Sequence, residues 1–139
     1  DKMAEAYAAY DSALVYNPSN IGALNNYAYY LSVERRELDK AEEMSFKTVK
    51  AEPKNSTYLD TYAWILFEKG NYAEARIYID EALKNGGEQS DVIVEHSGDI
   101  YYMTGDVENA LKFWKKALEM GSKSATIKKK IEQKKYITE

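Results

Sequence analysis

The chain repeats itself every 34 or 35 residues, and this internal repeat constrains the fold more than any other feature of the sequence. When the sequence is shifted by one period, small residues fall on small residues and large apolar residues fall on large apolar ones. The aligned sets are Ala6, Ala41, Ala75 and Ala110; Ala13, Thr48, Ala82 and Ala117; Leu24, Leu59 and Val94; Ala28, Ala63 and Gly98; Leu31, Leu66 and Tyr101; Pro18 and Pro53; and Gly70 and Gly105. The sequence therefore predicts an array of like units that bury their seams against one another.

Each unit has the pattern of two amphipathic helices joined by a tight turn. The first helix has apolar or small residues at i, i+4 and i+7, and the second has the alanines that let two helices approach closely. Gly70-Asn71 and Gly105-Asp106 separate the two helices, because glycine closes a helix and Asn or Asp caps the next one. With 2 prolines and 7 glycines among good helix formers, an all-α chain is predicted. The turn SVERRELD lacks glycine and has one extra residue, so it is expected to be irregular.

At these positions the chain resembles the tetratricopeptide repeat (TPR) family. Ser45 and Thr48 depart from the family pattern, and Gly87 and Ser122 stand near places where the family has proline. The resemblance covers residues 2–121 and implies an α-α superhelix, a right-handed solenoid of antiparallel helix pairs. LNNYAYYL and LDTYAWILF resemble bacterial members. The residues that carry the resemblance are Leu59, Ala63, Leu66, Gly70, Tyr72, Ala75, Ile79 and Ala82 in one unit, and Val94, Gly98, Tyr101, Gly105, Ala110, Trp114 and Ala117 in the next.

Residues 1–139 are expected to form one domain. Residues 2–17 have the pattern of a second helix without its first, residues 20–52, 55–86 and 90–121 form complete units, and residues 123–136 form a C-terminal capping helix with Ile127 and Ile131 on its apolar side. The incomplete first unit suggests the C-terminal part of a longer array. An uncovered face on residues 2–17 is expected to favour dimer formation, and its members are Ala6, Tyr10, Ala13 and Leu14.

His96, the only histidine, lies beside Glu95 and three residues before Asp99. Glu95 and Asp99 share a helix face, whereas His96 is rotated by about 100° from Glu95. A helical zinc site usually presents two histidines at i and i+4, so a groove-facing, solvated helix is favoured over a metal or catalytic site. No glycine-rich phosphate loop is present, and no histidine is placed to activate the serine of NGGEQSD. The sequence predicts a protein that is not an enzyme and has no cofactor.

The family resemblance implies that the first helices line a concave groove. Its expected residues are Asn25, Asn26 and Tyr29 in the first unit, Asp60, Trp64, Phe67 and Glu68 in the second, and Glu95, Asp99 and Tyr102 in the third. The alternative for Trp64, Phe67 and Tyr102 is packing between repeats. These positions contain no lysine or arginine, so the cationic clamp with which some family members hold a terminal carboxylate is not expected.

The charge distribution narrows the class of partner. Residues 123–139 have six lysines and two glutamates, a net +4, which leaves −8 for residues 1–122 of a chain with net charge −4. Such an acidic body argues against nucleic-acid binding, and the basic end is interpreted as a solvated helix end. No membrane-spanning segment is present, and cytoplasm and cell envelope stay open. The predicted function is a protein-interaction module for a peptide with apolar anchors and basic or neutral flanks; the alternative is a structural segment of a longer solenoid without a separate ligand.

Overall fold

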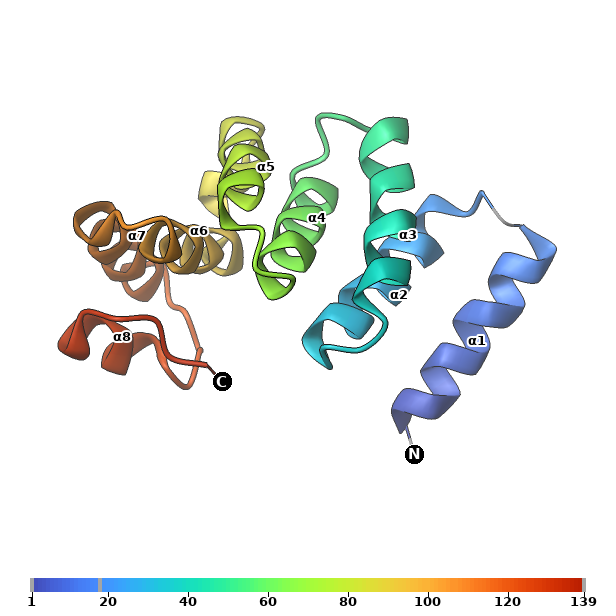
Figure 1. Cartoon of the computed structure of the whole chain (residues 1–139), viewed down its shortest axis with the longest axis horizontal. Helices are drawn as coiled ribbons and strands as arrows, with labels where there is room; N and C mark the ends of the chain where they lie inside the picture. Colours follow the sequence, from blue (N-terminus) through green and yellow to red (C-terminus); the bar gives the residue numbers. More distant parts are fainter. Residues whose placement is uncertain (1, 18, 139) are drawn as a thin grey trace.

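The computed structural model describes residues 2–17 and 19–138, and within them the chain is helical with no strand. The helices follow one another as antiparallel neighbours and stack along the long axis of the molecule (Figure 1). This arrangement confirms the predicted all-α superhelix. The helices are α1 (Lys2–Tyr16), α2 (Ile21–Val33), α3 (Leu38–Ala51), α4 (Ser56–Glu68), α5 (Tyr72–Lys84), the short 3-10 helix η1 (Gly87–Gln89), α6 (Asp91–Met103), α7 (Val107–Glu119) and α8 (Ile127–Gln133).

The first helix of each complete pair begins at a side-chain cap. Asn20 Oδ1 accepts the backbone N–H of Ala23 at 3.1 Å, and Asn55 and Ser90 cap α4 and α6 in the same way. Such a bond satisfies one of the N–H groups that a helix start leaves unpaired. Among the second helices, α7 has the predicted cap, because Asp106 accepts the N–H of Asn109. Asn71 makes no side-chain cap bond, so that part of the prediction is wrong.

The turns of the second and third units depend on glycine. Gly70 and Gly105 have φ of 85° and 93°, a left-handed conformation that glycine adopts without a steric penalty. The first unit has no glycine at this place. There Arg35 and Glu37 take left-handed conformations with φ of 53° and 45°, so the expected irregular turn consists of two strained residues.

Replacing Glu37 with glycine is expected to raise the free energy of unfolding by about 1 kcal/mol, because the substitution removes the left-handed strain. Glu43 is also exposed but lies within helix α3. Glu43→Gly is the control and is expected to lower stability by about 1 kcal/mol, since glycine is a poor helix former. Urea unfolding followed by circular dichroism measures both changes. Equal losses in the two variants would show that Glu37 is unstrained.

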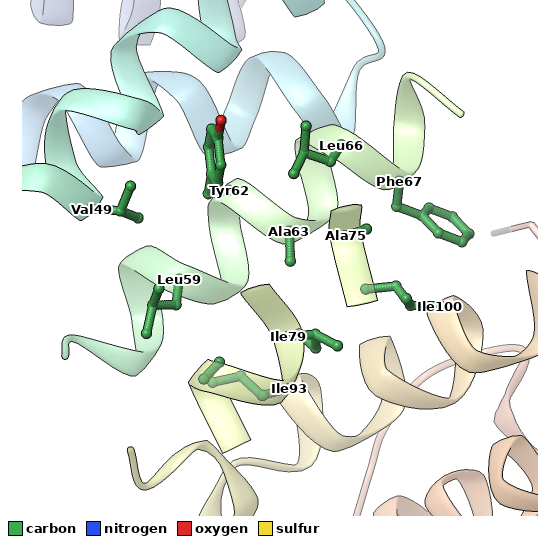
Figure 2. Packing of buried hydrophobic residues seen from close by; sticks show 11 residues of the cluster. Val49, Leu59, Tyr62, Ala63, Leu66, Phe67, Ala75, Ile79, Ile93 and Ile100 are labelled. Atoms are coloured by element: carbon green, nitrogen blue, oxygen red, sulfur yellow. The ribbon is translucent and has the colours of Figure 1, made fainter. Parts of the chain in front are cut away.

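The central core forms where α3, α4, α5 and α6 meet (Figure 2). Ala63, Ala75 and Ala82 are fully buried, and their small side chains leave room for Leu66 and Ile79 between the helices. Helix α2 packs on α4 and α4 packs on α6, whereas α3, α5 and α7 each pack on the first helices beside them. The first helices α2, α4 and α6 therefore line the inner side of the stack, as the family resemblance implies.

Helix α1 differs from the prediction of an uncovered face. Tyr10 and Leu14 are half-buried and pack against the core cluster around Tyr27 of α2. Tyr7 is 8% exposed and stacks on Tyr27 at 5.4 Å between ring centroids. Ala6 and Ala13 are half-buried as well. Tyr10 and Leu14 are therefore covered in part by α2, and the dimer expected from this face stays a prediction.

The capping helix expected over residues 123–136 is shorter, because α8 covers only Ile127–Gln133. Ser122 and Ser124 accept backbone N–H groups of Ser124 and Thr126 through their hydroxyls, and such local bonds compete with helix formation. At the other end, Lys134 takes a left-handed conformation with φ of 54° and turns the chain away from the helix axis. The basic end is also not simply solvated, since Lys130 is 2% exposed.

Candidate functional site

A cavity of about 350 Å³ opens on the inner side of the stack. Residues of α2, α4, α6 and α8 line it, together with Tyr136 and Ile137 beyond α8. Five of the ten residues predicted for the groove lie on its wall: Tyr29, Trp64, Glu68, Glu95 and Asp99. The inner surface expected from the sequence thus contains a cavity that extends from α2 to the residues after α8.

The other five predicted residues lie beside the cavity or away from it. Asn26 is exposed, and Asn25 is 6% exposed with an Oδ1 atom that has no hydrogen-bond partner. Phe67 is 5% exposed and belongs to the core between repeats. Tyr102 is half-buried and tilted against Trp114, with 5.9 Å between ring centroids. Asp60 is 7% exposed and points to the neighbouring repeat.

Three rings form a continuous stack on the inner side. Trp64 stacks on His96 of the next repeat at 4.0 Å between centroids, with 19° between the ring planes. Its other neighbour is Phe67, at 4.5 Å and 15°. Trp64 is half-buried and lines the cavity, as does His96. The cavity therefore has an aromatic platform at which a flat or apolar group can pack.

Each of the four carboxylates predicted for the groove contacts a basic side chain of the same chain. Asp60 Oδ1 lies 2.8 Å from Nδ1 of His96, and Glu68 lies 2.7 Å from Nε of Arg35. Lys130 of α8 reaches across to α6, where its Nζ lies 2.8 Å from Oε2 of Glu95 and 2.9 Å from Oδ1 of Asp99. The groove is consequently less acidic than its sequence suggests.

Burial and charge compete at the cluster of Lys130, Glu95 and Asp99. Burial raises the pKa of Asp99 to about 6, although the charge of Lys130 opposes this shift. Burial is also the largest single effect on Glu95 and acts in the same direction. The hydrogen bond and charge of Lys130, with the hydrogen bonds of Ser122 and Ser124, together outweigh it and hold the pKa of Glu95 below the usual range. Asp99 also accepts a hydrogen bond from Nε1 of Trp114 at 3.0 Å. This cluster fastens α8 to the inner face of α6 and to the core of α7.

His96 is held by Asp60 and Trp64 rather than solvated. Its side chain is 14% exposed, so the expected solvated surface histidine is corrected to a half-buried one. Burial would lower the pKa of His96, but the charge and hydrogen bond of Asp60 raise it above its ordinary value. Within residues 2–17 and 19–138, no group of three His, Asp or Glu side chains is arranged to hold a metal ion.

The raised pKa of His96 predicts a pH dependence of stability. The folded protein holds this proton more tightly than the unfolded chain, whose pKa is near 6.5. The stabilisation is therefore complete below that value and is lost as the pH rises through the folded pKa. We expect the unfolding free energy to fall as the pH rises above about 6.5, at no more than about 1.4 kcal/mol per pH unit, and to level off above the folded pKa.

The variant His96→Gln isolates this contribution. Urea unfolding across the same pH range is expected to show a flatter profile for the variant, because glutamine does not titrate. The titration of Asp99 is centred in a lower window, from 3.8 to about 6, and Asp99 is present in both proteins. Parallel profiles for the two proteins would show that the Asp60–His96 contact does not stabilise the protonated ring.

Sequence reasoning did not place Arg35, Lys130 and Tyr136 in the site, and it did not pair His96 with Asp60. The sequence feature that could have revealed these pairs is that oppositely charged residues are separated by about one repeat length. His96 follows Asp60 by 36 residues, Lys130 follows Glu95 by 35, and Glu68 follows Arg35 by 33. Because residues one period apart lie on adjacent helices of the same face, such spacing predicts ion pairs between repeats.

No helix in the described part of the chain is long and apolar enough to span a membrane. No family model and no curated protein sequence matches the chain.

Solved structures are similar to it in fold. The first TPR domain of Spaghetti (RPAP3), bound to the HSP90 peptide SRMEEVD, has a TM-score of 0.72 at 16% identity over 82% of this chain and 89% of that one. The TPR protein TTC0263 of Thermus thermophilus has a TM-score of 0.75 at 15% identity over 96% of this chain and 74% of that one. MamA has a TM-score of 0.74 at 15% identity over 92% of this chain and 74% of that one. Identities this low bear on the fold alone, and the chain has the TPR-type helical-repeat fold that its sequence predicts.

Proposed function

We propose that the protein is a non-catalytic interaction module that binds a peptide segment of another protein on its inner face. The observation that carries the proposal is the half-buried ring of Trp64, stacked on His96 and Phe67 and open to a cavity of about 350 Å³. Partly exposed tryptophans in a groove are frequent anchors of binding energy, since they bury a large area on contact. Helical repeat arrays present such concave surfaces to partners.

The chemistry of the groove favours apolar anchors with basic or neutral flanks. The peptide bound to the Spaghetti domain is acidic. In this chain the two cations that line the cavity, Arg35 and Lys130, already contact carboxylates. An acidic peptide would have to replace these internal partners, whereas an apolar anchor needs only the aromatic platform. A basic flank would be attracted by the net charge of −8 on residues 1–122.

The alternative is a structural role in which the groove is filled from within a larger assembly. One observation favours it: α8 and the residues after it already occupy the C-terminal end of the inner face. In that case the aromatic platform packs against another part of the same protein or assembly, and no separate ligand exists.

Peptide selection separates the two functions. The full chain is used to select binders from a library of random peptides, and the affinity of the selected peptide is measured by calorimetry. Trp64→Ala is expected to weaken binding at least about tenfold. The control, Phe46→Ala, removes a 42% exposed ring from α3, away from the cavity, and is expected to leave the affinity within about twofold. Equal effects of the two substitutions would contradict groove binding, and selection of no peptide would favour the structural role.

A further inference from the structure

The residues after α8 return to the inner face of the stack. Lys134 turns the chain in a left-handed conformation, and the N–H of Lys135 bonds to the carbonyl oxygen of Lys130 at 3.2 Å. From this turn the chain runs back from α8 towards the middle of the molecule (Figure 1). Tyr136 and Ile137 are half-buried there, whereas Lys134, Lys135 and Thr138 are exposed. Two side chains of this short segment, Tyr136 and Ile137, therefore contact the rest of the protein.

Tyr136 occupies an aromatic position at the edge of the cavity. Its ring meets Phe67 of α4 edge-on, with 5.2 Å between centroids and 83° between the planes. The ammonium group of Lys130 lies 5.3 Å from the centre of the same ring. Ile137 lines the cavity beside it. The ring of Tyr136 thus makes an edge-to-face contact and a cation–π contact, the two favourable geometries for an aromatic side chain.

Capping of the last repeat does not explain why the side chains of Tyr136 and Ile137 lie in the groove. Helix α8 covers Ile127, which is 2% exposed, and its ion pairs hold it against α6. Phe67 lies on α4, one repeat further back, and Tyr136 reaches it from beyond the end of α8. Releasing Tyr136 and Ile137 requires no helix to unfold, so they can leave the groove while the cap stays in place.

We propose that Tyr136 and Ile137 are an internal ligand of the groove, and that a partner segment with an aromatic residue followed by an aliphatic one displaces them. This inference rests on the proposed function, because it names the kind of segment that the groove takes and the competitor that this segment must replace.

The tether makes a weak internal ligand effective. A short flexible linker gives an effective concentration on the order of 1 mM. If the segment is docked about nine-tenths of the time, the same sequence added as a free peptide has a Kd of about 0.1 mM. Removing the internal ligand then raises the affinity for an external segment about tenfold, because the fraction of open groove rises from about one tenth to one.

The experiment uses the full chain carrying Tyr136→Ala and a synthetic peptide of residues 132–138, EQKKYIT. NMR titration is expected to give saturable binding at about 0.1 mM to this variant and binding at least about tenfold weaker to the unaltered chain. Tyr136→Phe keeps the ring and is expected to behave as the unaltered chain. The peptide EQKKAIT is expected not to bind. Equal binding of EQKKYIT to the variant and to the unaltered chain would overturn the proposal.

A second measurement avoids any dependence on the stability of the variant. In the unaltered chain, the ring signals of Tyr136 are followed while the peptide selected for the groove is added. Displacement moves these signals to the values of a solvated tyrosine, and unmoved signals at saturation overturn the proposal. The two proposals fail differently. If a selected peptide binds with an affinity that depends on Trp64 but not on Tyr136, the internal ligand is refuted and the proposed function stands. If EQKKYIT binds but no external peptide can be selected, the proposed function is refuted and the internal ligand stands.

Discussion

Replacing Gly98 with alanine is expected to destabilise the protein by about 3 kcal/mol. An added Cβ atom would lie 2.4 Å from Cδ1 and 2.5 Å from Nε1 of Trp114, and 3.1 Å from the carbonyl oxygen of Ala110. Trp114 is fully buried and donates its N–H to Asp99, so its ring has no room to move aside. Helices α6 and α7 would have to separate, which disrupts the seam of the third repeat.

Gly22→Ala is the matched control, since it makes the same change in another first helix. There the nearest atom to a new Cβ is Oδ1 of Asn20, at an ordinary contact distance of 3.7 Å. Alanine is a better helix former than glycine, so this variant is expected to be more stable by about 0.5 kcal/mol. Urea unfolding followed by circular dichroism gives both values. Similar changes in the two variants would contradict the close packing of Gly98 on Trp114.

Replacing Lys130 with methionine is the second change with a large expected effect, a loss of about 3 kcal/mol. Methionine fills a similar volume but leaves Glu95 and Asp99 without their cation, and their side chains are 9% and 2% exposed. Uncompensated buried charge is unfavourable, so the C-terminal end of the stack is expected to open first. The loss is expected to be smaller at about pH 5 than at about pH 8, because a protonated Asp99 no longer needs the ammonium group.

Lys129→Met controls for the loss of one surface lysine. Lys129 is exposed on the same helix, and its replacement is expected to change stability by less than about 0.5 kcal/mol. Hydrogen exchange locates the effect: for Lys130→Met, amide protection is expected to fall in α8 and at the end of α6 before it falls in α4 and α5. If both variants behave alike, the ion pairs of Lys130 add no net stability.

The repeat pattern was sufficient to predict the helices and their seams, because these depend on local and periodic features. Ala63, Ala75 and Ala82 recur where helices must approach closely, and Gly70 and Gly105 mark turns that only a left-handed residue closes. The same reasoning failed at the ends of the chain, where the period stops. There Ser122 and Ser124 bond to the backbone and delay α8, and the face of α1 that was expected to be bare packs on α2.

The position of the groove was predictable, but its charge was not. Trp64, Glu68, Glu95 and Asp99 lie on the cavity wall because the periodicity of a helix places them on one face. Their partners come from a turn and from a helix that the repeat pattern does not describe. Lys130 was interpreted as solvent-exposed among other lysines, and nothing in its own helix distinguishes it from Lys129. The one sequence feature that indicates the buried ion pair of Lys130 and Glu95 is their separation by one repeat period.

The most direct test of a peptide-binding inner face is NMR mapping of the selected peptide on the full chain. A peptide-binding inner face predicts that the largest chemical-shift changes occur at the indole N–H of Trp64 and along the inner sides of α4 and α6, while α3, α5 and α7 change little. Changes centred on those three outer helices, with the Trp64 signal unmoved at saturation, would contradict it.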